Sequence, residues 1–141
     1  MTARPGGEVA ALQTALAAEH AASYGYGVVG AHLRGTAFNV AAADGVIHER
    51  ARDDLVKLIS SLGARPNPAA VAYQLPVDVK NAADAARLAV DLELAVVASY
   101  LDLVAAADPR LRTLAATSMR DAYVRAARWG ARSQPFPGLA R

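Results

Sequence analysis

The sequence has 141 residues, which suits one domain, and its hydrophobic residues make up 54% of the chain although aromatic residues make up only 6%. Much of that apolar fraction is alanine, which favours helices. The absence of cysteine excludes disulfides, thiolate chemistry and cysteine-ligated zinc or iron–sulfur centres. A net charge of only +2, with both signs interleaved, argues against nucleic acid as a partner.

Membrane and secretory signals are missing from the pattern. No apolar run reaches the roughly 18–20 residues of a membrane span, because Asp91, Glu93 and Asp102 interrupt the richest stretch. The first seven residues lack the basic-then-apolar plan of a signal peptide. We expect a cytoplasmic protein with no membrane partner, built as a single domain over residues 1–141 with a short arm at 1–7 and a proline-rich tail at 132–141.

Apolar residues recur at helical spacing in four segments, which predict helices over residues 8–33, 36–62, 82–107 and 109–131. Their ends carry start and stop signals. Gly63 follows the second segment as a C-terminal glycine. Asn81, with Asp84 three residues later, resembles a capping box, and Asp108 before Pro109 reads as an N-cap followed by proline. The near-direct turn at Asp108 predicts that the third and fourth helices are antiparallel.

The link over residues 63–80 holds three prolines and is long enough to cross the full height of a bundle. Tyr73 and Leu75 are expected to anchor this crossover against the helices. Two short hairpins joined by one long crossover is the connectivity of ferritin-like bundles. The fold class predicted is therefore all-α, an antiparallel four-helix bundle with a long crossover between the second and third helices.

Three of the predicted helices carry a glutamate in the middle of a core stripe, namely Glu19, Glu49 and Glu93. Solvated charges are not expected there, because an unpaired buried carboxylate is costly. The stripe expected to face the core on the second helix is Phe38, Ala42, Gly45, Glu49, Arg52, Val56 and Ile59.

A faint internal repeat relates the two hairpins. Glu19 precedes Tyr26 by seven residues, and Glu93 precedes Tyr100 by seven. Superposing these pairs maps the first hairpin onto the second and keeps the core faces aligned, so we prefer it. A second register, which leaves Glu19 without an acidic counterpart, aligns Ala22-Ser23-Tyr24 with Ala98-Ser99-Tyr100.

Several motifs resemble one family over nearly the whole chain from Leu12 onward. They are His48-Glu49-Arg50-Ala51-Arg52-Asp53, Tyr73-Gln74-Leu75-Pro76, Glu93, Ala126-Ala127-Arg128-Trp129 and Phe136-Pro137-Gly138-Leu139. With these motifs the chain resembles the ferritin-like superfamily and, more closely, an alanine-rich bacterial ferritin-like family designated a domain of unknown function. The resemblance implies the fold and assigns no reaction.

Metal-loaded ferritin-like bundles take one glutamate from each of two helices and a Glu-x-x-His pair from each of the other two. The resemblance implies that Glu19 and Glu93 match the single glutamates. Glu49 matches the glutamate of the first pair, but Arg52 stands at its histidine position. The predicted fourth helix has no glutamate or histidine, and its only carboxylate beyond the capping residue is Asp121. The ligand set is incomplete.

Two functions remain open. In the favoured one, the protein is a non-catalytic homodimer that binds a partner or a small apolar ligand, with no cofactor. Its core is then a relict polar network in which Arg52 lies among the three glutamates. Arg52 and Arg125 replace the metal charge there, since arginine presents five donors. That network consists of Arg52, Arg125, Asp121, Tyr26 and Tyr100, with Asp121 placed four residues before Arg125 at ion-pair spacing.

The alternative is an iron or manganese oxidoreductase of the di-iron type, with a carboxylate-bridged site of Glu19, Glu49 and Glu93, or with a single-metal or altered site that uses His48 with Glu49. His48 lies about 100° around a helix from Glu49, so both cannot face one centre equally. We therefore interpret His48 as a hydrogen-bonded histidine between helices. A homodimer is expected from the alanine-rich faces, the three glycines of the first predicted helix and an apolar tail with Phe136 and Leu139.

Overall fold

The computed structural model describes residues 5–132, and within that range it contains four α-helices, one 3₁₀ helix and no strand. These elements are α1 (Pro5–Ala31), α2 (Gly35–Ser61), α3 (Ala82–Ser99), η1 (Leu101–Ala105) and α4 (Pro109–Arg128). The prediction of an all-α protein is confirmed for this part of the chain. None of its helices combines the length and apolarity that crossing a membrane demands. The tail with Phe136 and Leu139 lies outside the described residues.

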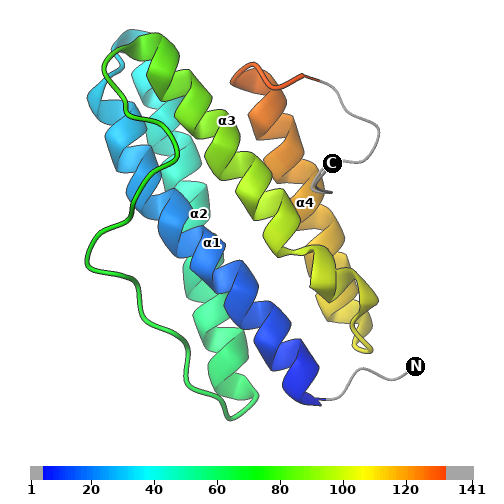
Figure 1. The fold of residues 1–141 in the computed structure, drawn as a ribbon. Coiled ribbons are helices and arrows are strands. Elements are labelled where there is room, and N and C mark those ends of the chain that lie inside the picture. The colour runs from blue at the N-terminus through cyan, green and yellow to red at the C-terminus, as the bar shows by residue number, and fades with distance from the viewer. Residues whose placement is uncertain (1–4, 133–141) are drawn as a thin grey trace.

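Figure 1 shows two antiparallel helical hairpins, α1 with α2 and α3 with α4. The segment between Leu62 and Asn81 runs along the outside of the bundle from one end to the other. As a result α1 and α4 point in one direction, and α2 and α3 point in the other. The ring of Tyr73 in this segment lies 5.3 Å from the ring of Tyr24. Leu75 packs on buried residues of the bundle, so the predicted anchors of the crossover are confirmed.

Side-chain caps set the predicted starts of the last two α-helices. The Asn81 side chain accepts a hydrogen bond from the Asp84 amide at 2.8 Å. Asp108 accepts one from the Arg110 amide at 2.9 Å, with Pro109 in the first turn. Gly63 has φ +79°, the left-handed conformation that a C-terminal glycine supplies. These three capping predictions are confirmed.

Three predicted boundaries are wrong by three residues or more, one of them the end of the fourth helix, which stops at Arg128 rather than Ala131. The first helix begins at Pro5 rather than Glu8. The third predicted helix, 82–107, is α-helical only as far as Ser99 and then tightens into η1. The Ser99 hydroxyl donates to the Val96 carbonyl at 2.7 Å, and 3₁₀ turns are common at helix ends. Apolar periodicity cannot distinguish these two helix types over one turn.

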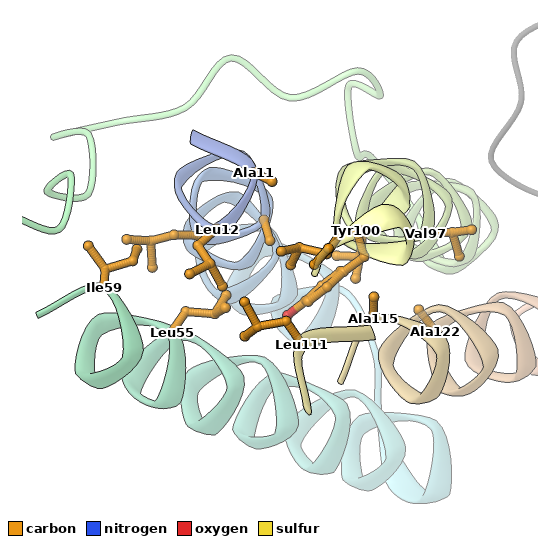
Figure 2. Packing of buried hydrophobic residues seen from close by; sticks show 14 of the residues in the cluster. Ala11, Leu12, Leu55, Ile59, Val97, Tyr100, Leu111, Ala115 and Ala122 are labelled. Carbon is orange, nitrogen blue, oxygen red and sulfur yellow. The ribbon is translucent and has the colours of Figure 1, made fainter. Parts of the chain in front are cut away.

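Two clusters of buried apolar side chains fill the bundle. Figure 2 shows residues of the first, which includes Leu12, Leu55, Ile59 and Tyr100. The second gathers around α1 and α3 at the other end, with Val29, Ala85, Leu88 and Leu92 among its members. Along α2 and α3 the clusters are separated by two buried polar residues, His48 and Glu93. The polar site therefore lies at mid-height between two dry regions.

The face of α2 that enters the core differs from the prediction by about 100°, one helical step. The buried residues of α2 are Ala41, Asp44, His48, Leu55 and Ile59. Phe38 is 46% exposed, and Glu49 is exposed as well. Asp44 and His48 enter the core in place of the predicted Glu49 and Arg52, although burying charged groups is costly. Both residues are buried here because hydrogen-bond partners from other helices satisfy them.

Candidate functional site

His48 is the centre of the buried polar site and has no exposed surface. Its Nδ1 lies 2.6 Å from Glu19 Oε2, and its Nε2 lies 2.8 Å from Glu93 Oε1. Carboxylate oxygens only accept hydrogen bonds, so two such contacts require a proton on both ring nitrogens. Burial alone lowers the pKa of His48, but the hydrogen bonds and charges of the two glutamates outweigh it and raise the pKa to about 9. The ring is therefore an imidazolium cation at neutral pH.

Two tyrosines extend the site in opposite directions. The Tyr26 hydroxyl of α1 donates to Glu93 Oε1 of α3 at 2.7 Å. Reciprocally, the Tyr100 hydroxyl at the end of α3 donates to Glu19 Oε1 of α1 at 2.8 Å. Burial, and next the adjacent glutamate charge, raise the pKa of each tyrosine. Both phenols therefore stay neutral and act as donors that orient the carboxylates.

Arg125 of α4 completes the charge balance. Its Nε donates to Glu93 Oε1 at 2.9 Å, and the residue is buried. Burial raises the pKa of Glu93, but the hydrogen bond and charge of His48 and the charge of Arg125 hold it below its usual value. With His48 protonated, two carboxylates face two cations. The site is electrically neutral without any further ion.

A second polar cluster joins α2 to the end of α4. The buried Asp44 carboxylate accepts from Arg128 Nη2 at 3.2 Å and from Trp129 Nε1 at 2.9 Å. The two clusters touch through Tyr26, whose ring centroid lies 5.4 Å from that of His48 and 6.4 Å from that of Trp129. Sequence reasoning missed Asp44, although it lies four residues before His48 and so on the same helical face.

The structure brings together six of the predicted site residues: Glu19, His48, Glu93, Tyr26, Tyr100 and Arg125. It places the other three outside the site. Glu49 is exposed and makes no hydrogen bond or ion pair within the described chain. Arg52 pairs with its neighbour Asp53, with Nε to Oδ1 at 3.0 Å, and its side chain is 33% exposed. Asp121 pairs with Arg120 at 3.1 Å.

Three structural expectations are therefore wrong. Arg52 does not lie among the glutamates, and Glu49 does not face the core. Both errors follow from the face of α2, which is turned by one residue. Asp121 does not pair with Arg125, because Arg125 turns inward to Glu93, where a buried ion pair is screened less than an exposed one.

The donor atoms of the site do not fit a carboxylate-bridged pair of metal ions. Both oxygens of Glu19 accept hydrogen bonds, and Glu93 Oε1 receives three donors. The ring nitrogens of His48 are both committed to carboxylates. Within residues 5–132, no three histidine, aspartate or glutamate side chains are placed to hold an ion. Glu93 Oε2, buried with no hydrogen-bond partner, is the one oxygen of the two glutamates left over.

Comparison with known proteins gives a family and a similar structure. Residues 11–141 match the family described as Domain of unknown function (DUF4439). The crystal structure of a conserved hypothetical protein, rv2844, from Mycobacterium tuberculosis is similar, with 38% sequence identity and a TM-score of 0.86. The match covers 90% of this chain and 97% of that one. No curated protein matches the chain.

Proposed function

This chain belongs to the DUF4439 family, a domain of unknown function, and we propose that it is a non-catalytic, homodimeric interaction protein with a ferritin-like fold. In this proposal a network of buried ion pairs stands in the bundle core at the place of a metal centre. One observation carries it: the imidazolium of His48 bridges Glu19 and Glu93, the two carboxylates that a bridging ion would otherwise neutralise.

The connectivity supports the ferritin-like part of the proposal. Two antiparallel hairpins are joined by a crossover that runs the length of the bundle. Glu19 of α1 and Glu93 of α3 face each other in the bundle core, where ferritin-like bundles carry their single glutamates. The connectivity and these two positions support the proposal, whereas the remaining ligand positions do not.

The second function, an iron or manganese oxidoreductase, needs atoms that the network has already used. A metal would have to displace His48 and a tyrosine from Glu19, and three donors from Glu93 Oε1. His48 would then have to lose its proton, because only neutral imidazole binds metal. Metal binding would therefore cost the hydrogen bonds and the proton that now hold the two carboxylates in place. The geometry therefore favours the first function.

Metal content tests the core of the proposal. We expect protein purified from medium supplemented with iron, manganese and zinc to carry less than about one tenth of an ion per chain, with an unfolding temperature unchanged by chelator or added Fe²⁺ or Mn²⁺. Glu93→Gln, with Glu49→Gln as its exposed control, serves as a check. Bound metal that raises the unfolding temperature, and that Glu93→Gln abolishes while Glu49→Gln retains, would establish a metal site there and favour the oxidoreductase instead.

Light scattering at micromolar concentration tests the association. We expect a mass of twice the 14.6 kDa of one chain. The physical reason is the surface of α2, where Phe38, Val46 and Ile47 are each more than 40% exposed, a gathering that marks interaction sites. A monodisperse single chain would contradict the homodimer and leave the metal result untouched.

A further inference from the structure

The first half of α2 presents an uncharged outer face. From Gly35 to Ile47 the only charged residue is Asp44, which is buried against α4. The second half of the same helix is the opposite and carries six charged residues, namely Glu49, Arg50, Arg52, Asp53, Asp54 and Lys57. Phe38 is 46% exposed and Val46 is 42% exposed on the uncharged half. Contact with water explains the charged outer face of the second half of α2, but it does not explain the uncharged, partly apolar outer face of the first half.

The stripe of Phe38, Ala42, Gly45 and Glu49 has the periodicity of a packed face, with steps of four, three and four. Sequence analysis therefore assigned it to the core of the bundle. In the structure it borders a surface hollow of about 390 Å³ between α1 and α2. The bundle covers this stripe only in part: Gly45 lies near Tyr26 and Phe38 lies near Gly30 of α1, but Phe38, Ala42 and Glu49 remain exposed.

The hollow lies beside two large exposed side chains, Phe38 and Val46. Small residues line the hollow, including Ser23, Gly27 and Gly30 of α1 and Gly45 of α2. A Cβ atom added at Gly27 would meet nothing within 4 Å, so the space above it is open. Phe38 and Val46 form its walls and are large and exposed. A surface with both a knob and a hole can pack on a copy of itself.

Opposite charges bound the uncharged half of α2. Arg34 lies just before it and Glu49 just after it, both exposed and without an ion pair among residues 5–132. In two antiparallel copies of α2, Arg34 lies opposite Glu49 when the positions of facing residues sum to 83. In that same register Phe38 lies opposite Gly45, since 38 and 45 also sum to 83. One symmetric arrangement thus satisfies both the charges and the shapes.

We propose that this face of α1 and α2 binds a second copy of the chain, with the two α2 helices antiparallel. Phe38 enters the hollow at Gly45 of the partner subunit, and Arg34 pairs with Glu49 of the partner subunit. The twofold axis passes between Ala41 and Ala42. This inference rests on the proposed homodimer and names its surface, so the two can fail separately.

Sedimentation equilibrium measures the dissociation constant of the dimer and so tests whether this face forms the interface. Phe38→Glu should raise it at least about thirtyfold, because it places a charge in the centre of an apolar contact. Arg50→Glu, one residue beyond the proposed contact, should change it less than about threefold. Circular dichroism should show an unchanged helical spectrum for both, since each side chain is exposed in the bundle.

A charge swap tests the register. Arg34→Glu and Glu49→Arg should each weaken the dimer by about three- to tenfold, since each places like charges opposite one another. The double variant should return the constant to within about threefold of the wild type. The natural chain has no cysteine, so Ala42→Cys should form a symmetric disulfide on oxidation, whereas Ala127→Cys on the exposed side of α4 should not.

These outcomes separate the two proposals. If Phe38→Glu leaves the wild-type dimer intact, the interface lies elsewhere, and the inference fails while the homodimer stands. The same follows if the double charge variant dimerises no more tightly than the two single variants. Equal crosslinking of Ala42→Cys and Ala127→Cys would do the same. A wild type that is monomeric at about 100 µM would overturn the inference together with the homodimer.

Discussion

The stability of the protein should fall between neutral and alkaline pH because of one side chain. The pKa of His48 rises from 6.5 in the unfolded chain to about 9 in the bundle. A difference of this size corresponds to about 3 kcal/mol of stability. A raised pKa means that the folded state holds the proton more tightly. The contribution is therefore complete below pH 6.5, declines as pH rises, and is lost above about 9.

Urea unfolding followed by circular dichroism at several pH values measures this contribution. The wild-type free energy of unfolding should drop by about 3 kcal/mol from pH 6 to pH 9.5. The tyrosines do not enter this window, because their unfolded pKa is near 10 and their folded pKa is higher still. His48→Gln removes the titrating group and leaves two buried carboxylates with one cation. It should cost about 3–5 kcal/mol at pH 6, and the deficit should shrink toward pH 9.5.

His32→Gln is the matched control, because His32 is exposed at the end of α1 and its ring bonds the Val28 carbonyl rather than a carboxylate. It should leave the pH dependence as it is in the wild type. A wild-type free energy that is flat from pH 6.5 to 9 would refute the bridging imidazolium. The same conclusion would follow if His48→Gln and the wild type had parallel pH profiles.

Three further substitutions separate the buried site from its surroundings. Glu93→Gln leaves the Arg125 cation buried without its counter-charge and should cost about 3–5 kcal/mol at pH 7 in the same urea assay; a cost under about 1 kcal/mol would mean that the pair is solvated. Arg52→Leu should cost less than about 1 kcal/mol at any pH, because the side chain is partly exposed and pairs only with its neighbour Asp53. A large, pH-dependent loss of unfolding free energy would instead show that Arg52 pairs with the buried glutamates. Asn81→Ala removes the cap of α3 and should lower stability by about 1 kcal/mol, while Asn39→Ala, exposed in the second turn of α2, should be neutral or slightly stabilising; equal effects would contradict the capping role of Asn81.

The helices were predictable from sequence because their signals are local. Apolar spacing marks the four helical segments. Asn81 and Asp108 mark helix starts because their side chains accept hydrogen bonds from free backbone amides, and Gly63 marks a helix end because glycine readily adopts a positive φ. The change from α to 3₁₀ after Ser99 had no such signal. It depends on contacts made across the bundle, such as Glu8 Oε1 accepting the Ala107 amide at 3.0 Å.

A buried site residue was predictable only where no neighbouring polar residue could have faced the core in its place. Glu19 and Glu93 are single carboxylates on otherwise apolar stripes, so their burial could be inferred. On α2, Glu49 and His48 are adjacent, and either could have faced the core. Which one does so depends on partners from two other helices, α1 and α3, because a buried histidine is tolerated only when both nitrogens are satisfied. Pairings of that kind are a property of the assembled bundle and cannot be read from one helix.

The internal repeat gains a physical meaning from the reciprocal tyrosine contacts. Antiparallel helices place residues opposite one another when their positions sum to a constant. For Tyr26 with Glu93, and for Tyr100 with Glu19, that sum is 119 in both cases. The equal spacing of seven residues on α1 and α3 is what allows both contacts to form in one register. This geometry favours the first alignment of the two hairpins, because both contacts join a tyrosine of one helix to the equivalent glutamate of the other.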